Sequence, residues 1–307
     1  MKVIAVVVTY NRKELLKECV DALLSQDYEN CSVLIVDNAS TDGTPEFIRE
    51  ERENPRVYYR NTGSNLGGAG GFNYGIREAY KIGCDFIWVM DDDCIVHKDT
   101  LTALINADHQ LKGRYGFLSS KVLWKDGSLC QMNIQKKTLV KKLTDPDLNW
   151  QRVVLATFVS LFLKASVVKE IGLPYKEFVI WTDDWEYTRR ISRSYPCYYI
   201  SKSVVTHKCA TNTGSAIETA EKDRLGRFRY MYRNEAVLYR AEGPKGWFLF
   251  GVRLAMHKAR ILKSDLPAED KMERLRLIDE AVAEGKKFYP QIEYVDETTD
   301  EKDEGNS

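Results

Sequence analysis

The sequence lacks the features that mark several specialised classes of protein. No window of its 307 residues approaches the about 18 to 20 consecutive apolar residues that a membrane-spanning helix needs. The seven cysteines are odd in number and form no Cys-x-x-Cys pair, which predicts reduced thiols, with Cys19, Cys31 and Cys84 filling the core. No signal-peptide layout stands at the N-terminus, so we expect a cytoplasmic protein.

An excess of charge of one sign is also missing. The net charge is zero, but residues 291–307 hold seven acidic residues and one basic residue, which leaves 44 basic and 38 acidic groups in residues 1–290. The acidic tail has few apolar residues after Val295, so we expect it to be disordered. The small positive excess elsewhere suits an anionic small ligand or an acidic membrane surface and is too weak for nucleic-acid binding.

Common ligand motifs are absent as well. No glycine loop ends in Gly-Lys-Ser or Gly-Lys-Thr, which excludes a P-loop. The dinucleotide motif G-x-G-x-x-G does not fit segment 65–73, because Asn73 stands where the last glycine would fall. An EF-hand is excluded after Asp91, since Cys94 and Ile95 occupy positions that need acids and glycine.

The order of apolar segments predicts the fold class. Strand-like runs alternate with helical patterns in the first half of the chain, which indicates an α/β fold with a mostly parallel sheet flanked by helices. The expected strands are 3–9, 32–36, 57–60, 86–90, 116–124, 153–163 and 196–205. Asn11 is expected to cap the first helix, with Glu14 as its capping-box partner.

No internal repeat and no linker rich in proline, glycine or serine divides the chain. The polar segment 125–150 is expected to be irregular, and the pattern beyond Ala216 is helical. We therefore predict a catalytic domain over residues 1–215, a helical C-terminal extension over residues 216–290, and the acidic tail.

Three consecutive acids follow the most apolar of these strands. Asp91, Asp92 and Asp93 come directly after Phe86 to Met90. Unpaired charges are costly to bury, so the acids must lie at the mouth of the strand, where ligands of open parallel sheets bind. A divalent cation with oxygen ligands and substrate phosphates is one explanation, and a solvated acidic turn is the other.

Other strand ends carry polar residues suited to a nucleotide. Thr9 and Arg12 follow the first strand and Asp37 follows the second. An arginine can neutralise a phosphate and an aspartate can accept a bond from a base or ribose, although ordinary turns also favour such residues. Four glycines within residues 67–71 open a helix and would let backbone N–H groups approach a diphosphate; a tight strand–helix junction is the alternative.

A second acidic pair lies between two tryptophans. Asp183 and Asp184 start a predicted helix and are flanked by Trp181 and Trp185. Aromatic walls can raise the pKa of a carboxyl group and can stack on a sugar, whereas a simple helix cap would need only the acids. His207 ends a strand and could be either a metal ligand or a structural histidine.

Taken together, these segments resemble the inverting family-2 glycosyltransferases of GT-A fold. The resemblance rests on Val-Val-Thr-Tyr-Asn-Arg at 7–12, Val-Asp-Asn-Ala-Ser-Thr-Asp-Gly-Thr at 36–44, Asn-Leu-Gly-Gly-Ala-Gly-Gly-Phe at 65–72, the three aspartates, and Thr-Asp-Asp-Trp-Glu-Tyr at 182–187. It covers roughly residues 1–240. The glycine segment, residues 181–187 and the Arg233-Asn234 pair are similar to galactofuranosyltransferases, and nearly as similar to rhamnosyltransferases.

The resemblance implies a role for each of these residues. Thr9, Arg12 and Asp37 would hold the uridine diphosphate; Asn65 and the glycines Gly67, Gly68 and Gly71 would face the donor; Asp92 would touch ribose or sugar. Asp91, Asp93 and His207 would bind Mn²⁺ or Mg²⁺. Asp184 matches the catalytic base and Asp183 would orient the acceptor, although the Asp-Asp pair departs from the usual Glu-Asp pair of the family. Trp181 and Trp185 would line the acceptor or sugar site.

The expected activity is a metal-dependent, inverting transfer of a sugar from a UDP-sugar, with UDP-galactofuranose favoured, to a glycan or lipid-linked glycan. A rhamnosyltransferase using dTDP-rhamnose is the enzymatic alternative, and a nucleotide-binding assembly subunit is the non-enzymatic one. Residues 243–263 combine aromatic and apolar residues with Lys and Arg, a pattern that fits contact with a membrane surface, packing on the catalytic domain, or a homo-oligomer.

Overall fold

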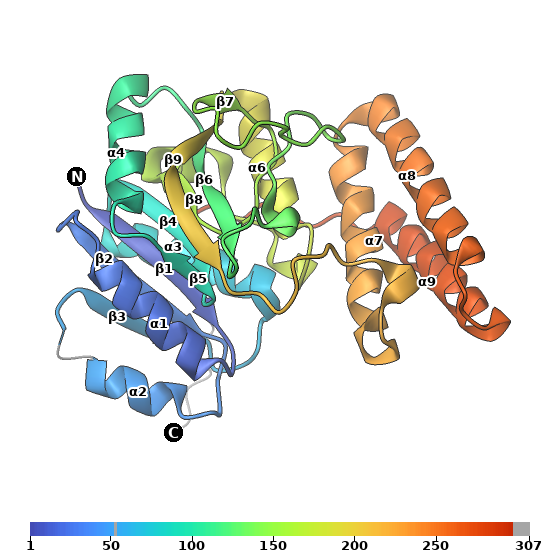
Figure 1. Ribbon diagram of the computed structural model, residues 1–307, viewed down its shortest axis with the longest axis horizontal. Helices are drawn as coiled ribbons and strands as arrows, with labels where there is room; N and C mark the ends of the chain where they lie inside the picture. Colours follow the sequence, from blue (N-terminus) through green and yellow to red (C-terminus); the bar gives the residue numbers. More distant parts are fainter. Residues whose placement is uncertain (52–53, 297–307) are drawn as a thin grey trace.

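A mixed sheet forms the centre of the computed structural model, which describes residues 1–51 and 54–296 (Figure 1). Its strands are β1 (Val3–Thr9), β2 (Cys31–Asp37), β3 (Val57–Asn61), β4 (Phe86–Asp91), β5 (Cys94–Val96), β6 (Phe117–Trp124), β7 (Gln151–Arg152), β8 (Leu161–Lys164) and β9 (Tyr198–His207). The order is β3-β2-β1-β4-β8-β6-β9-β5, with β7 beside β9. Strands β1 to β4 run parallel, while β8 is antiparallel to β4 and to β6. The predicted α/β class, a central sheet flanked by helices, is confirmed, and the sheet is mixed because β5, β7 and β8 each pair antiparallel with a neighbour.

Helices cover both faces of the sheet because its strands are apolar on both sides. The helices of this part are α1 (Lys13–Leu24), α2 (Thr44–Glu51), α3 (Gly67–Ile82), α4 (Thr100–Leu111), α5 (Ala165–Ile171) and α6 (Asp183–Ser194). In β1, Val3, Ala5 and Val7 face a core with α1 and α4, whereas Ile4 and Val6 face a core with α3 and α5. This alternation is the two-residue period of a strand buried on both faces.

Strand register brings the polar strand ends to one edge. Parallel pairing sets Thr9 beside Asp37 and Val8 beside Asp91. At the far side of the sheet, β5 pairs with β9 so that Cys94 lies opposite His207. The short turn between β4 and β5 therefore carries the acidic residues from the end of β4 to the start of β5, which lies opposite the end of β9.

Three further helices form the C-terminal extension, drawn in orange and red at one side of Figure 1. They are α7 (Leu225–Arg240), α8 (Gly243–Lys263) and α9 (Ala268–Lys287). They share apolar clusters of their own, and Val237 joins Ala69 and Phe178 to attach α7 to the sheet domain. None of the helices in residues 1–51 and 54–296 is long and apolar enough to cross a membrane.

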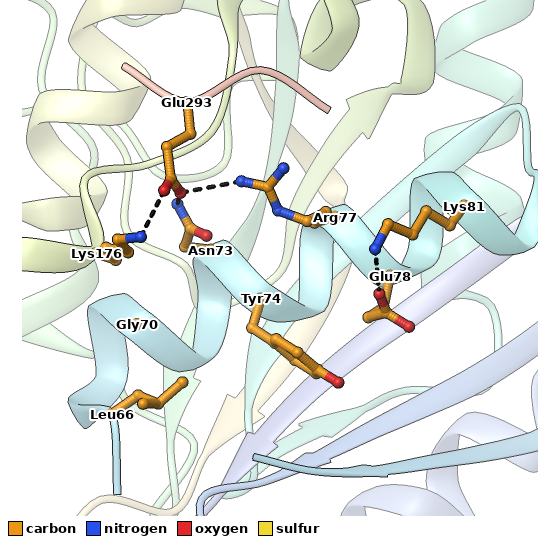
Figure 2. Close-up of a pocket in the computed structure, with 9 residues that line it drawn as sticks. All are labelled: Leu66, Gly70, Asn73, Tyr74, Arg77, Glu78, Lys81, Lys176 and Glu293. Carbon is orange, nitrogen blue, oxygen red and sulfur yellow. Dashed lines mark hydrogen bonds and ion pairs between the residues drawn. The ribbon is translucent and has the colours of Figure 1, made fainter. Parts of the chain in front are cut away.

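The chain then returns to the sheet domain and lies against α3. The carboxylate of Glu293 accepts bonds from Asn73 at 3.1 Å and Arg77 at 3.0 Å and pairs with Lys176 at 2.5 Å (Figure 2). Val295 is buried. The expectation that the tail is disordered is therefore wrong for residues 291–296, because Glu293 forms specific ion pairs and Val295 packs into the apolar core. Residues 297–307 lie outside the described residues.

Two local expectations are also wrong. Within 153–163 only residues 161–163 belong to a strand, the start of β8. The segment before it makes an isolated bridge between Leu155 and Lys136 and is otherwise buried by packing. Asn11 does not cap α1, whose N-cap is Arg12. The Asn11 side chain instead accepts a bond from the Thr41 N–H at 2.7 Å, which joins the loop after β1 to the loop after β2.

Candidate active site

One cavity of about 550 Å³ lies between the carboxyl edge of the sheet and the C-terminal helices. Its wall brings together seven of the residues singled out in the sequence: Gly68, Asp91, Trp181, Asp183, Asp184, Trp185 and His207. A second cavity of about 640 Å³ lies beside α3 and the returning tail (Figure 2). The second cavity contains none of these residues, so the chemistry is sought in the first.

The three predicted metal ligands meet at the edge of the sheet. One ligand atom each from Asp91, Asp93 and His207 lies within 4.8 Å of the other two. Asp93 Oδ1 is 3.0 Å from His207 Nε2, a contact that the pairing of β5 with β9 produces. Two carboxylate oxygens and an imidazole nitrogen form a donor set suited to Mn²⁺ or Mg²⁺ that also binds phosphate oxygens.

The hydrogen bonds around His207 fit a bound cation. Its Nδ1 lies 2.8 Å from Asn133 Oδ1, an acceptor, so Nδ1 carries a proton. Nε2 faces Asp93 and offers a lone pair to a metal only when it carries no proton itself. Asp93 Oδ1 is then buried without a hydrogen-bond donor. Either a proton on Nε2 or a metal ion has to separate these two lone pairs. Burial lowers the pKa of His207, but the bond to Asp93 and the charges of Asp93 and Asp91 raise it to about 10, so a metal must displace that proton.

Sulfur atoms lie on the other side of the same histidine. Cys130 and Cys209 could form a metal group with His207. A soft metal would need thiolates, and burial raises the pKa of Cys209 to about 12. Cys130 Sγ also donates to Asn133 Oδ1 at 2.9 Å, the atom that accepts from Nδ1. The carboxylate side is therefore the better candidate for a divalent ion.

Thr9 and Arg12 are brought to the acidic turn. Thr9 Oγ1 donates to Asp92 at 2.8 Å, while the Arg12 guanidinium bonds to Asp92 and Asp93, both at 2.8 Å. Burial raises the pKa of Asp92 to about 7, and Arg12 opposes this rise. In this structure Arg12 compensates the buried acids, and its half-exposed guanidinium also faces solvent.

Asp37 and Asn65 lie farther along the same edge, outside the cavity wall. Asp37 is fully buried, and its carboxylate accepts bonds from Tyr59 at 2.7 Å and from the Ser40 N–H at 2.8 Å. Asn65 is exposed, and its Oδ1 accepts the Gly67 N–H at 2.9 Å. In the structure both side chains therefore accept hydrogen bonds that stabilise the loops at the strand ends.

The glycines of α3 divide into two groups. A Cβ at Gly71 would lie 2.6 Å from Val8, and one at Gly67 would collide with the Val179 carbonyl, so these two glycines allow α3 to approach the sheet and a loop. Gly68 has open space where a Cβ would be and lines the cavity. The strand–helix junction accounts for Gly67 and Gly71, and Gly68 alone offers backbone to a ligand in this cavity.

Asp183 and Asp184 begin α6 at the cavity wall. Burial raises the pKa of Asp183 to about 7, and burial followed by the Asp183 charge raises the pKa of Asp184 well above its usual range. The negative charge of Asp91 raises both of these pKa values further. Asp184 Oδ1 accepts the backbone N–H of Trp185 at 2.7 Å, the one hydrogen bond to this oxygen found among the described residues. A carboxyl group with a raised pKa near a metal site is suited to accept a proton from an incoming hydroxyl.

A strained loop presents these acids. Val179, Trp181 and Thr182 all have positive φ, at 64°, 64° and 70°. Asn234 of α7 holds the loop by donating its Nδ2 to the carbonyls of Phe178 at 3.0 Å and Trp181 at 2.9 Å. The C-terminal helices therefore help to build the site. The sequence pattern could not reveal this use of Asn234.

Sequence reasoning missed four charged residues of the cavity wall: Lys136, Lys142, Glu235 and Arg253. Lys136 lies 3.4 Å above the ring of Trp185, and Arg253 binds the buried Glu235 through bonds of 2.7 to 3.0 Å. Asn133, which orients His207, was missed as well. Asn133 and Lys136 come from the irregular segment 125–150, where no periodic signal marks a buried position.

Comparison with known proteins gives three kinds of match. Residues 4–113 match the model of the family described as glycosyl transferase family 2. Galactofuranosyltransferase GlfT1 of Mycolicibacterium smegmatis is 29% identical over 288 residues, which cover 81% of this chain and 88% of that protein.

Solved structures of proteins bound to nucleotide sugars share the fold. TarS 1–349 of S. aureus in complex with UDP-GlcNAc has a TM-score of 0.54 at 17% identity, covering 92% of this chain and 72% of that one. Mannosyltransferase PcManGT from Pyrobaculum calidifontis, in complex with GDP-Man and Mn²⁺, has a TM-score of 0.55 at 17% identity, covering 94% and 76%. At these identities the likeness establishes the GT-A fold.

Proposed function

The chain is a glycosyltransferase with a family 2 domain, and from this premise we propose that it transfers galactofuranose from UDP-galactofuranose to a glycan or lipid-linked glycan acceptor. The observation that carries the proposal is the shared cavity. Its wall holds Asp91 and His207 of the candidate metal centre together with Asp183 and Asp184. A leaving diphosphate and an attacking hydroxyl need these two kinds of group on opposite sides of one sugar.

The residues have separate roles in this proposal. Asp184 accepts the proton of the acceptor hydroxyl as that oxygen attacks the anomeric carbon, and the configuration inverts because one displacement occurs. Asp183 orients the acceptor, and Trp181 and Trp185 offer ring faces to a sugar. When bound to Asp91, Asp93 and His207, a divalent ion would supply positive charge for the leaving diphosphate.

Similarity to GlfT1 over 81% of the chain supports galactofuranose as the sugar. The rhamnosyltransferase alternative would use the same residues with a dTDP-sugar as donor. No residue of the cavity favours rhamnose over galactofuranose. We expect either reaction to depend on a divalent ion, because Asp91, Asp93 and His207 form a candidate metal site.

Donor assays would test the proposal. Purified chain is given UDP-galactofuranose, UDP-galactopyranose or dTDP-rhamnose, each with Mn²⁺ and with EDTA, and release of the nucleotide diphosphate is measured. Release from UDP-galactofuranose alone, and only with metal, is the expected result. Release from dTDP-rhamnose alone would favour the alternative, and binding of UDP without turnover of any donor would overturn the enzymatic proposal.

We also propose that α8 contacts a lipid surface. Phe248, Val252 and Met256 are 70%, 44% and 51% exposed and recur at a spacing of four, which places them on one side of the helix. Phe250 and Ile261 point to the interior instead. Lys245 and Lys263, at the two ends of α8, provide positive charge for anionic headgroups. A membrane-bound enzyme of this kind would act on a lipid-linked acceptor.

A further inference from the structure

Lys136 is a buried amine for which no ion pair is found in the described part of the chain. Burial lowers the pKa of Lys136 to about 7, so the amine is charged below that pH. Its side chain belongs to the loop between β6 and β7, and the residue is only 8% exposed. Across residues 1–51 and 54–296, no hydrogen bond and no ion pair of its ammonium group is found; the group lies 3.4 Å above the centre of the Trp185 ring. Lys136 also lines the cavity that holds Asp184. An ammonium group taken out of water normally has an anionic partner.

The charged neighbours of Lys136 cannot act as that partner. Glu235 is the closest candidate on α7, but both of its oxygens are bound by Arg253 of α8, at 2.7 to 3.0 Å. Lys142, on the same loop, adds a further positive charge to the cavity wall. Asp184 faces the same cavity and its charge acts to raise the pKa of Lys136, but no ion pair joins the two side chains among the described residues. Once Glu235 and Arg253 neutralise each other, this part of the wall is positive.

The ammonium group is also held in place. The backbone of Lys136 bonds in both directions, accepting from the Val154 N–H at 2.8 Å and donating to Leu155 at 3.0 Å. The neighbouring Gln135 donates to Ser119 at 2.7 Å, which fixes the loop on the sheet. The indole of Trp185 then supports the ammonium from one side, and both side chains line the cavity. A flexible surface lysine would have none of these constraints.

The position relative to the catalytic groups decides which substrate would meet this cation. Lys136 and Asp184 line the same cavity and the charge of each shifts the pKa of the other, so Lys136 lies near the proposed base. The donor diphosphate belongs at the other group of charges, around Asp93 and His207. An anion next to the base must therefore come from the acceptor.

We propose that Lys136 and the ring of Trp185 form a subsite for an anionic group of the acceptor, either a phosphate ester or a carboxylate. This inference rests on the proposed glycosyl transfer, because it assumes an acceptor in the cavity. A phosphate or carboxylate oxygen completes the ammonium's hydrogen bonds, and the indole supports the sugar or alkyl part that carries the anion. A neutral acceptor leaves the ammonium buried and unpaired, so the subsite selects for charge.

Binding of three matched sugars to the full chain would test the subsite. The protein is saturated with UDP and Mn²⁺ to fill the donor side, and dissociation constants for glucose, glucose 6-phosphate and glucuronate are measured by calorimetry at pH 6.5. At least one of the two anionic sugars is expected to bind tenfold or more tightly than glucose. The two anions, which differ only at carbon 6, separate phosphate from carboxylate recognition.

Variants assign the preference to Lys136. The preference should disappear in Lys136→Met, persist in Lys136→Arg, and stay unchanged in the matched control Lys141→Met, an exposed lysine of the same loop. UDP binding reports that each variant is folded, and the wild-type comparison with glucose needs no variant at all. Equal binding of all three sugars by the wild type would overturn the proposal. An anion preference that survives in Lys136→Met would do the same, even if turnover fell because Asp184 lost a nearby positive charge.

These experiments separate failure of the anion subsite from failure of the proposed glycosyl transfer. If no donor is turned over but the anion preference depends on Lys136, the subsite stands and the assigned reaction falls. If UDP-galactofuranose is turned over and no anion preference exists, the reaction stands and the subsite falls.

Discussion

Asn133 Oδ1 lies 2.8 Å from His207 Nδ1, and this contact fixes the tautomer of the histidine at the candidate metal centre. The amide group of Asn133 is itself oriented, because its Nδ2 donates to Thr157 at 2.9 Å. A metal-binding histidine generally needs such a partner on its other nitrogen. Asn133 is therefore a positioning residue: it contacts the metal ligand His207 and is not itself one of the metal ligands.

The first prediction concerns this partner. Replacing Asn133 by leucine should weaken Mn²⁺ binding about 10- to 100-fold, because His207 loses the acceptor that directs its free lone pair toward Asp93. Asn133→Asp keeps an acceptor at the same position and should keep most of the affinity. Titration of Mn²⁺ by calorimetry measures both values. An unchanged affinity in the leucine variant would contradict the role given to Asn133.

A second prediction concerns the loop that carries the catalytic acids. Asn234→Leu removes the donor to the carbonyls of Phe178 and Trp181 and should lower the free energy of unfolding by about 1 to 3 kcal/mol. Turnover should fall more than UDP affinity, since the loop holds Asp184 and not the nucleotide. Urea unfolding and initial rates measure the two effects. Arg229→Ala, at an exposed ion pair of the same helix, should change stability by less than about 1 kcal/mol.

The sequence carried enough information to predict how the site is assembled around the sheet. Apolar runs that end in Thr9, Asp37 and Asp91 must bring these residues to one edge once the strands pair in parallel. The role of His207 followed from the resemblance, and its place beside Asp93 depends on the pairing of β5 with β9. Periodicity does not reveal a pairing between strands so far apart in sequence.

Other parts could not be predicted because packing alone determines them. Lys136 and Asn133 are polar residues of a segment that the sequence predicts to be irregular, yet long-range contacts bury both. Residues 153–160 are apolar without pairing as a strand, since an apolar run records burial and not hydrogen bonding. The tail at Glu293 is ordered by three side chains, from α3 and from the loop before α6, that the sequence does not associate with it.

A third prediction uses the buried acid at the start of α6. Burial raises the pKa of Asp183 to about 7, so the folded protein holds this proton at pH values where the unfolded chain has lost it. The cost of the buried charge is absent below about pH 4, develops as the pH rises toward 7, and is complete above it. Asp183→Asn should therefore add roughly 2 to 4 kcal/mol to the free energy of unfolding at pH 8 and little at pH 4.5.

Urea unfolding at the two pH values measures this difference. The exposed residue Asp265 supplies a matched control, because Asp265→Asn should change the free energy of unfolding only slightly, and to the same extent at both pH values. A gain from Asp183→Asn that is the same at pH 4.5 and pH 8 would show that the charge of Asp183 is not its source.

A fourth prediction tests the exposed side of α8. A Phe248→Glu, Met256→Glu double variant should lose flotation with vesicles containing one third anionic lipid, because it removes the apolar contact and adds negative charge. Leu148→Glu, which changes a residue that is 56% exposed far from α8 in the chain, should float as the wild type does. Wild-type protein that stays unbound, or a double variant that still floats, would contradict the membrane role.

The last prediction separates the proposed base from the groups that bind the donor. Asp184→Asn keeps the size of the side chain but cannot accept a proton, so transfer should fall about 100- to 10,000-fold. UDP affinity should stay within about twofold, because no bond joins Asp184 to Asp93 or His207 in the described part of the chain and loss of one negative charge leaves the ligand set intact. The turnover of the wild type should also fall as the pH is lowered, since the raised pKa of Asp184 leaves its carboxyl group protonated and unable to act as a base. Initial rates from pH 5 to 9 and UDP calorimetry measure these effects, with Asp91→Asn as the contrasting variant that should weaken metal binding as well. If Asp184→Asn retains full turnover, the proton must pass to another group, and Asp183 is then the base to test.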